Sequence, residues 1–203
     1  MIRHDAAQGT DEWFAARRGI PSASMADKIL SPTGIPSKQA DAYANQLIAE
    51  RLTGLSGGFQ GNTHTDRGTE LEPEARAYYA FVSGCEVEEV GFCLTDDGTF
   101  GCSPDGMVGD DGMVEIKAPS PANHIGYLLG GKVPTAYLAQ VQSQLFVTGR
   151  AWLDFMSYAP SLDPLLIRVE PDLEWHDRFE KELEKFTRLL AYKMEKLKER
   201  GVI

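Results

Sequence analysis

The sequence predicts an α/β fold in which a mixed central sheet is flanked by helices on both of its faces. The main observation is that helical and strand-like periodicities follow one another in the order helix, helix, strands, helix, strands, helix. A second is that the 203 residues, 42% hydrophobic and 25% charged, have the length and composition of a globular protein with a substantial core. A third is that no internal repeat or low-complexity linker divides the chain, so residues 1–203 are expected to form a single domain.

Two helices are expected in the first part of the chain. Thr10 is a favourable N-cap for a short helix, which breaks at Gly19 and Pro21. Residues 40–53 carry apolar side chains at helical spacing, and Gly54 is a natural stop for that helix.

A glycine-rich polar stretch, residues 54–68, follows, and its length suits a mobile or functional segment better than a simple connection. Thr69 is expected to open a third helix that ends near Ser83. Its predicted buried stripe consists of Leu71, Ala75, Tyr78 and Val82, which follow one another at intervals of four, three and four residues.

From residue 85 the periodicity becomes that of strands. Short strands separated by Asp/Gly turns are expected at residues 86–94, 98–102, 106–109 and 112–117. A helix is expected over residues 134–148, with an apolar face made of Leu138, Val141, Leu145 and Phe146. The segments WLDFMSYA and LLIRVE predict two more strands, and a charged amphipathic helix is expected over roughly residues 172–199.

Composition excludes several classes of protein. The three cysteines, Cys85, Cys93 and Cys102, form no CxxC pair, which argues against a zinc site, an iron–sulfur cluster or a disulfide framework and favours a reducing cytoplasm. No signal-peptide core and no apolar run of membrane length is present, so no membrane partner is expected. The net charge of −10 lowers the expectation of nucleic-acid binding. It does not exclude DNA, because carboxylates that bind divalent cations count as acidic in the sequence but not in the loaded site.

The stretch FGCSPDGMVGDDGMVEIKAP, residues 100–119, carries the chemistry. Its Gly-Asp-Asp-Gly segment suits a hairpin turn, and the hairpin can bring Asp105 beside Glu115. Glu115 and Lys117 are two residues apart on one strand and therefore share a face. Two carboxylates and a lysine suit hard divalent cations such as Mg²⁺ and the hydrolysis of a phosphodiester. On this spacing alone, a turn residue beside an exposed strand face is an equal alternative.

The segment SPDG…VEIKAP resembles the PD-(D/E)XK nucleases, specifically the phage lambda exonuclease type, also called the YqaJ-like viral recombinase family. Three further blocks resemble that family in the same order. EWFAARRGIPSAS is similar to its W-x₃-R-x-G-x-(S/T)-x-S block, RGTELEPEARAYY to its G-x₃-E helix, and AYLAQVQSQLFVTG to its glutamine-containing helix. The resemblance covers nearly the whole chain and implies a PD-(D/E)XK, restriction-endonuclease-like core.

The resemblance also implies the roles of individual residues. Asp105 and Glu115 match metal ligands, with the backbone carbonyl of Ile116 completing the ligand shell. Lys117 matches the residue that orients the nucleophilic water. Two helix residues are implied as well. Glu72 matches a ligand of the second metal, and Gln140 matches the side chain beside the nucleophile. A pocket for the 5′-phosphate of the digested strand is implied at four further residues, Arg17, Ser22, Ser24 and Ser103.

Each implied role has a structural alternative. Thr69 to Glu72 also reads as a capping box, and Glu70 and Glu74 are alternative metal ligands. Gln140 shares a helix face with Tyr137 and Gln144, which is equally consistent with a solvated polar stripe.

Alternatives remain open at the phosphate pocket too. Arg18 competes with Arg17, and Ser22 and Ser24 could be ordinary turn residues near Pro21. A lone histidine after the hairpin, His124, is interpreted as structural. One loop departs from the family pattern. The family usually has a basic residue there, ahead of the cleaved strand. The corresponding loop in this sequence is LSPTGIPSK, and Lys38 is the one cation in it, so the residue that guides the strand is not identified.

The resulting expectation is a Mg²⁺-dependent 5′-to-3′ exonuclease that digests one strand of linear double-stranded DNA to 5′-mononucleotides and leaves a 3′ single-stranded tail. The resemblance implies two metal ions per site, with Mn²⁺ able to substitute, and a homotrimeric ring around DNA. It also implies a single-strand annealing protein as partner in phage-type recombination. The chain itself would be encoded by a phage or prophage and would act in the bacterial cytoplasm.

Two other functions are weighed against this one. The first is another PD-(D/E)XK endonuclease or repair nuclease, including helicase-associated forms. The chain length and the absence of any cysteine after Cys102 count against the helicase-linked and iron–sulfur branches. The second is a catalytically silent module that binds DNA ends, against which the complete set of Asp105, Glu115 and Lys117 argues.

Overall fold

A five-stranded mixed sheet forms the centre of the structure, a computed structural model that describes residues 1–55 and 63–203, without the side chains of residues 63–69. The sheet has the order β2-β5-β6-β7-β8. Its central strand, β6, pairs antiparallel with β5 and parallel with β7. The strands span Val87–Glu88 (β2), Gly106–Val108 (β5), Gly112–Lys117 (β6), Trp152–Ser157 (β7) and Leu165–Val169 (β8).

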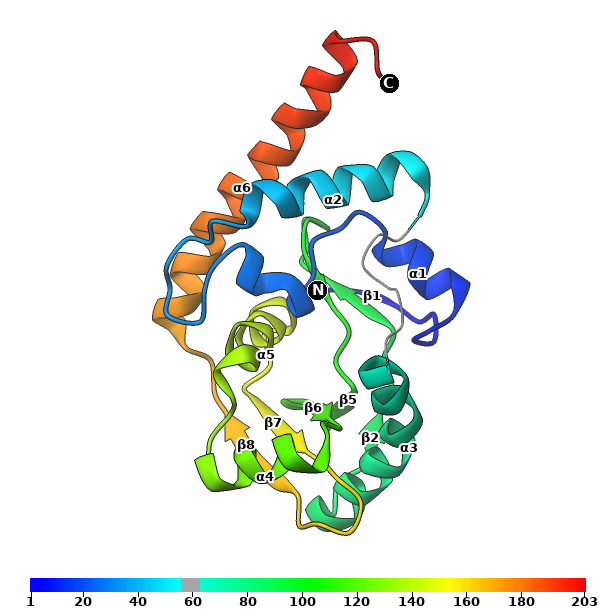
Figure 1. The fold of residues 1–203 in the computed structure, drawn as a ribbon, viewed down its shortest axis with the longest axis vertical. Coiled ribbons are helices and arrows are strands. Elements are labelled where there is room, and N and C mark those ends of the chain that lie inside the picture. Colours follow the sequence, from blue (N-terminus) through cyan, green and yellow to red (C-terminus); the bar gives the residue numbers. More distant parts are fainter. Residues whose placement is uncertain (56–62) are drawn as a thin grey trace.

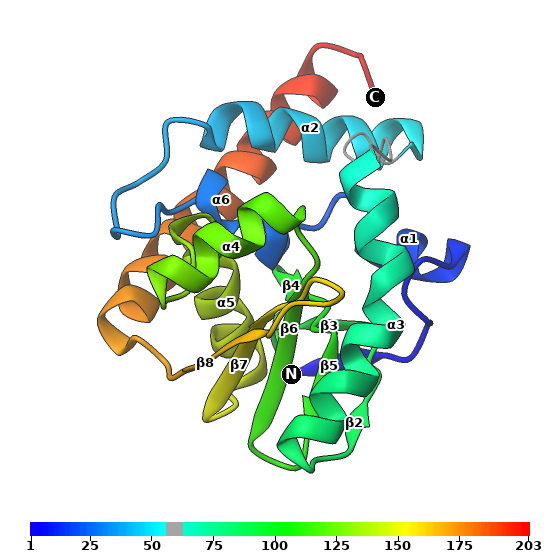
Figure 2. The same ribbon diagram turned by 60° about the horizontal axis from the view of Figure 1, so that its bottom comes forward.

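Helices cover both faces of this sheet, as the sequence predicts (Figures 1 and 2). They are α1 (Asp11–Arg17), the 3-10 helix η1 (Ala23–Lys28), α2 (Ala40–Thr53), α3 (Thr63–Ser83), α4 (Pro121–Gly130), α5 (Thr135–Thr148) and α6 (Leu173–Glu199). One face of the sheet packs on α3, where Ala75 and Tyr79 contact Val114 and Ile116 of β6. The other face packs on α5 in the largest core cluster, which includes Met113 of β6, and α6 packs in turn on α5 and α2.

Several local signals in the sequence produce the expected helix ends. The Thr10 side chain accepts a hydrogen bond from the backbone N–H of Trp13, which caps α1. Gly54 and Gly149 end α2 and α5 in the left-handed conformation, with φ of 71° and 65°. In the described part of the chain, no helix combines the length and the apolar character needed to cross a membrane.

A second, three-stranded sheet corrects the predicted strand over residues 86–94. It has the order β1-β3-β4, with β1 at Ile2–His4, β3 at Phe92–Leu94 and β4 at Gly101–Cys102. The predicted single strand is therefore split between β2 in one sheet and β3 in the other. The change of sheet occurs at Gly91, where a Cβ would lie only 2.2 Å from the carbonyl oxygen of Ala6. The strand period in the sequence carries no information on which sheet a segment joins.

Helix α3 differs from its prediction in two ways. It begins at Thr63 rather than Thr69, because the penalty of about 1 kcal/mol for Gly68 does not end a helix. Its buried residues are Ala75 and Tyr79, whereas Tyr78 and Val82 are 36% and 45% exposed. Of the glycine-rich stretch predicted at 54–68, residues 56–62 lie outside the described residues.

The three cysteines differ in their surroundings. Cys93 and Cys102 are buried and lie opposite each other in the β3–β4 pair. Cys85 follows the end of α3 and is exposed.

Candidate active site

The residues singled out in the sequence meet at one cavity of about 990 Å³. Its wall is built by α1, η1, α2, α3, β6 and α5, which surround the middle of the molecule in Figure 1. All the side chains predicted to act in catalysis or to bind the 5′-phosphate contribute to the lining: Arg17, Ser22, Ser24, Glu72, Ser103, Asp105, Glu115, Lys117 and Gln140.

The β5–β6 hairpin holds Asp105 beside the second strand. Gly106 lies opposite Val114 in the antiparallel register, so Asp105 is at the open end of the hairpin. The backbone N–H of Ile116 donates to Asp105 Oδ2 at 2.6 Å. On the other side, Arg76 of α3 donates from Nε to the Asp105 carbonyl oxygen at 2.9 Å. The hairpin therefore holds the carboxylate of Asp105, and α3 holds the backbone of the same residue.

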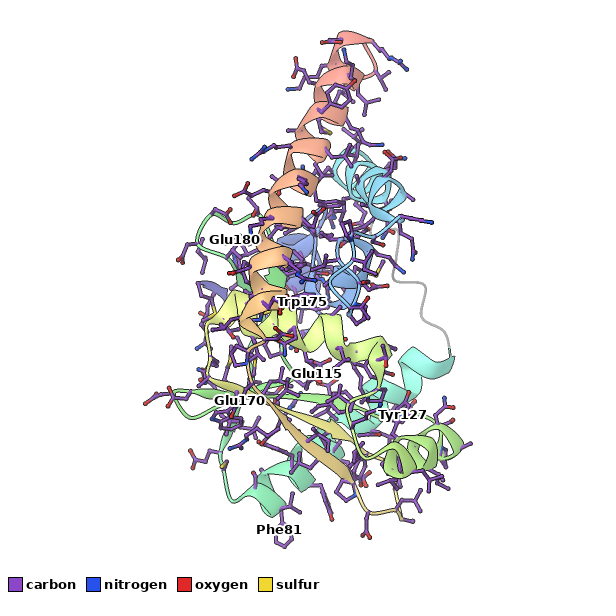
Figure 3. The ribbon with its side chains drawn as sticks, turned by 90° about the vertical axis from the view of Figure 1, so that its left-hand side faces the viewer. Phe81, Glu115, Tyr127, Glu170, Trp175 and Glu180 are labelled. Atoms are coloured by element: carbon purple, nitrogen blue, oxygen red, sulfur yellow. The ribbon has the colours of Figure 1, made fainter. Side chains whose placement is uncertain are left out.

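Glu115 is buried rather than part of an exposed strand face, with 2% of its surface accessible. Figure 3 labels it in the interior, between the central sheet and α5. Its Oε1 accepts from Lys117 Nζ at 2.6 Å and from Gln140 Nε2 at 2.5 Å, and its Oε2 accepts from Gln144 Nε2 at 2.6 Å. Such short bonds to a charged acceptor offset the cost of burying it.

The charge of Lys117 is stabilised by its neighbours. Burial alone would lower the pKa of this ammonium group, but the negative charges of Glu115 and Asp105 outweigh burial and hold the pKa above its ordinary value. Lys117 therefore stays protonated and available to donate hydrogen bonds into the cavity.

The acidic residues of the cavity destabilise one another. Burial, followed by the charge of Glu115, raises the pKa of Asp105 well above its ordinary value. Burial also raises the pKa of Glu72, and the charge of Glu115 adds to that rise against the opposing effect of Arg76. Buried and half-buried carboxylates whose charges repel one another are the set that a divalent cation neutralises, so these residues fit such an ion.

The arrangement is an open site rather than a closed cage of acidic ligands. Among the described residues, no group of three or more His, Cys, Asp or Glu is placed to hold a metal ion. Glu72 is turned toward Arg76, whose Nη2 donates to its Oε1 at 2.5 Å. Asp105 and Glu115 remain as the central pair, which suits Mg²⁺, an ion that binds through one or two carboxylates and keeps several waters.

The structure distinguishes among the three glutamates of α3. Because α3 begins at Thr63, Thr69 to Glu72 is not the first turn and cannot act as a capping box. Glu72 and Glu70 line the cavity. Glu74 instead accepts a hydrogen bond from the Tyr158 hydroxyl and is not part of the lining.

The predicted phosphate residues lie on the α1 and η1 side of the cavity. The Arg17 guanidinium stacks 4.1 Å from the centre of the Trp13 ring, and Trp13 Nε1 donates to Ser103 Oγ at 3.0 Å. The Ser22 and Ser24 hydroxyls are 3.3 Å apart. Burial lowers the pKa of Arg17, and within the described chain no carboxylate pairs with it. An arginine with this fork geometry and no counter-ion can bind phosphate in two bonds.

Two further residues belong to the cavity: Gln144, which the sequence did not single out as functional, and Arg18, which it named as the alternative to Arg17. Gln144 was seen only as part of a polar stripe with Gln140, yet it is fully buried and bonded to Glu115. Its position one turn after Gln140 was the available signal. Arg18 also lines the cavity, and its buried Nε has no hydrogen-bond partner among the described residues.

Two other predicted features lie away from the site. Lys38 is exposed and is not part of the lining. His124 is buried, with Nδ1 2.7 Å from Ser157 Oγ and Nε2 3.0 Å from the Asp163 carbonyl oxygen, as a structural histidine would be.

Known proteins resemble this chain in sequence and in structure. The model of a family described as the YqaJ-like viral recombinase domain matches residues 12–151. An alkaline exonuclease from Laribacter hongkongensis is 38% identical, with a TM-score of 0.86 over 95% of this chain and 98% of that chain. The structure of the same enzyme in complex with dAMP gives the same values.

A more distant likeness concerns the fold alone. A phage-related exonuclease from Haemophilus somnus 129PT is 14% identical, with a TM-score of 0.70 over 88% of this chain and 96% of that chain. No curated protein sequence matches the chain.

Proposed function

The chain belongs to the YqaJ-like viral recombinase domain family and has the PD-(D/E)XK fold, and on that premise we propose that it is a metal-dependent DNA exonuclease. Its substrate is the end of linear double-stranded DNA. It digests one strand from 5′ to 3′, releases 5′-mononucleotides and leaves a 3′ single-stranded tail. The observation that carries the proposal is that the cluster of Asp105, Glu115 and Lys117 shares a single cavity with the Arg17 pocket.

The carboxylates of the cavity supply the cation site in this proposal. Asp105, Glu115 and the backbone carbonyl of Ile116 would hold the ion, and Glu72, which Arg76 now binds, would be a ligand of a second ion. Mg²⁺ is the proposed ion, with Mn²⁺ able to substitute. When bound, the cations stabilise the charge on the attacking and leaving oxygens of the phosphodiester.

The remaining side chains orient the reactants. Protonated Lys117 donates a hydrogen bond to the nucleophilic water, and Gln140 lies beside that water as well as beside Glu115. Both groups already contact Glu115 Oε1, so they lie next to the proposed cation site. A water held between such groups is placed for attack before the substrate binds, which removes part of the entropic barrier.

The polarity of digestion follows from the phosphate pocket. Arg17, Ser22, Ser24 and Ser103 bind the 5′-terminal phosphate, so the next phosphodiester is presented to Asp105 and Glu115. The mononucleotide product is of the class to which dAMP belongs, and dAMP is the ligand of the related enzyme from Laribacter hongkongensis.

The assembly and partner are proposed from the family. Three copies form a ring that encloses the DNA, and a single-strand annealing protein receives the 3′ tail during phage-type recombination in the bacterial cytoplasm. The net charge of each chain is −10. In the proposed ring, most of the acidic side chains lie on the outside, while Lys and Arg line the channel. A trimer whose channel is lined with carboxylates away from the metal site would contradict this arrangement.

Digestion of end-labelled DNA tests the proposal. Linear duplex labelled at either the 5′ or the 3′ end is incubated with the protein in Mg²⁺ or in EDTA, in parallel with Asp105→Ala. We expect mononucleotides from 5′ ends in Mg²⁺ alone and none from the variant. Internal cuts would indicate an endonuclease of the same fold, and loss from 3′ ends would reverse the polarity. Binding of duplex ends without shortening in any divalent metal would indicate a silent binding module.

A further inference from the structure

Gln144 is a fully buried glutamine that makes one strong hydrogen bond and leaves its other polar atom unused. It lies one helical turn after Gln140 on α5, has no accessible surface, and donates from Nε2 to Glu115 Oε2 at 2.6 Å. Its Oε1 is buried and has no partner among the described residues. Buried acceptors without a partner are rare in native proteins and usually indicate a functional group or an ordered water.

The orientation of this amide is dictated by Glu115. If the amide were flipped, its carbonyl oxygen would face a carboxylate oxygen at hydrogen-bond distance, and two acceptors would repel each other. The NH₂ group must therefore face Glu115, and the unused Oε1 is a consequence of that bond.

Gln144 makes a contact to Glu115 that no other described side chain makes. Lys117 and Gln140 both donate to Oε1, and Gln144 alone donates to Oε2. The terminal torsion of a glutamate is broad, so a carboxylate held at one oxygen can still rotate. A second donor on the other oxygen fixes the plane of the group.

The neighbouring Gln142 shows what a structural glutamine on the same helix does. Its Oε1 accepts from the backbone N–H of Asp172 at 2.8 Å, and its Nε2 donates to the Glu170 carbonyl oxygen at 2.9 Å. Both ends of its amide are satisfied, and they connect α5 to the start of α6. Gln144 does not follow this pattern, because only its donor is satisfied.

We propose that Gln144 is a positioning residue that sets the divalent-cation affinity of the site by fixing the carboxylate plane of Glu115. Its free carbonyl oxygen accepts a hydrogen bond from a water that enters with the cation. This inference rests on the proposed function, since it assigns the residue to the same site. It adds a side chain that acts through Glu115 and touches neither the substrate nor the cation.

Cation binding by the full-length protein without DNA tests the inference. Isothermal titration with Mn²⁺ is compared for the wild type, Gln144→Met and Gln144→Asn. Met keeps the size without a donor, and Asn keeps the amide but is one methylene too short to reach Glu115. We expect both variants to bind Mn²⁺ about 10- to 100-fold more weakly, the usual effect of losing a partner of a metal ligand. The control Gln142→Met is expected to lower the melting temperature and leave Mn²⁺ affinity unchanged.

The nuclease readout separates positioning from a folding defect. For Gln144→Met, we expect the Mn²⁺ concentration that gives the half-maximal rate of digestion to rise by the same factor. The rate at saturating Mn²⁺ should stay near that of the wild type. The affinity for 5′-phosphorylated duplex, measured in EDTA, should be unchanged. Unaltered Mn²⁺ affinity in both Gln144 variants would overturn the inference and leave the proposed function standing. A wild-type protein that binds Mn²⁺ but digests no DNA would overturn the proposed function, while the comparison of affinities would still decide the role of Gln144.

Discussion

Among the described residues, Asp105 and Glu72 are the two carboxyl groups whose charge the fold disfavours. The pKa of each is raised, in both cases chiefly by burial and further by the charge of Glu115. Ionised carboxylates with raised pKa values lower the stability of the folded protein wherever they are forced to remain charged. The metal-free protein is therefore expected to be less stable than its core would allow.

Asp105→Asn is expected to raise the melting temperature in EDTA, because it removes a repelled charge and keeps an acceptor for the Ile116 N–H. Each kcal/mol of relief corresponds to a rise of about 2–4 °C for a chain of this size. In excess Mg²⁺ the wild type should gain stability, about 2.7 kcal/mol at 100 times the dissociation constant, and the variant should gain much less. Calorimetry in both buffers measures this. A variant that is less stable than the wild type in EDTA would contradict the account of repulsion.

Arg17 is expected to determine the preference for phosphorylated 5′ ends. Arg17→Ala removes the stacked guanidinium and should reduce the ratio of rates on 5′-phosphorylated and 5′-hydroxyl duplexes by about tenfold or more, since a hydrogen bond to a charged group contributes about 1.5–3 kcal/mol. The matched control is Arg18→Ala, on the next residue of the same cavity wall. If the Arg18 variant loses the preference and the Arg17 variant keeps it, the two roles must be exchanged.

At the scale of elements, α3 is tied to the central sheet by a polar network around the buried carboxylate of Asp154. The Tyr79 hydroxyl donates to Asp154 Oδ2 at 2.8 Å, and Arg168 binds the same carboxylate with two bonds of 2.9 Å. The Arg168 guanidinium also stacks 3.7 Å from the centre of the Trp152 ring. This network keeps α3, and with it Glu72 and Arg76, at a fixed position over β6 and β7.

Tyr79→Phe is expected to lower the free energy of unfolding by about 1.5–3 kcal/mol, because the buried Asp154 loses a donor to its charge. The rate of DNA digestion by the folded variant should change little, since Tyr79 is not part of the cavity lining. Urea denaturation measures the loss, with Tyr78→Phe on the exposed side of α3 as the control. Equal stability of the two variants would remove Tyr79 from the network.

The sequence predicts elements well where caps and periodicity agree. Residues 40–53 and the helix that ends before Gly149 are found as predicted, because glycine stops coincide with the ends of apolar stripes. The helix α4 was not predicted, although Ser120 caps it and Pro121 occupies its first turn. Strand β1 has three exposed residues and no alternation, so only its pairing with β3 defines it.

The sequence predicts which residues form the site better than it predicts how they are packed. Strand alternation places Glu115 and Lys117 on one face, but it does not reveal that this face is buried against α5. Gln144 illustrates why, since a polar residue on a helix is assigned to solvent until the packing is known. The contact of Asp105 with Ile116 follows from the hairpin that the sequence predicts, whereas its contact with Arg76 joins segments 29 residues apart and depends on the assembled fold.

At the scale of the whole molecule, one chain brings the proposed cation site and phosphate pocket to one cavity without help from a second copy. The end of α6 projects beyond the rest of the molecule in Figure 1, so part of this helix lies outside the packed body. The proposed ring is therefore needed for retention on DNA rather than for completing the cavity. Digestion and processivity should be separable properties.

Light scattering during size exclusion tests the ring. We expect a mass three times the 22.3 kDa of one chain at micromolar concentration. On dilution below the dissociation constant of the trimer, the protein should still release nucleotides but leave the DNA after short tracts. A mass of one chain that is independent of concentration, together with long uninterrupted digestion, would contradict the ring.

The unequal exposure of the cysteines has a practical consequence for following this digestion. Cys85 is exposed, whereas Cys93 and Cys102 are enclosed by the fold, so a maleimide dye added to the folded wild-type protein should attach at one position. That position follows the end of α3 and is outside the cavity lining. A fluorophore there would act as a native reporter of distance to a dye on the DNA. Single-molecule energy transfer could then record each advance along the duplex in real time, without engineered cysteines.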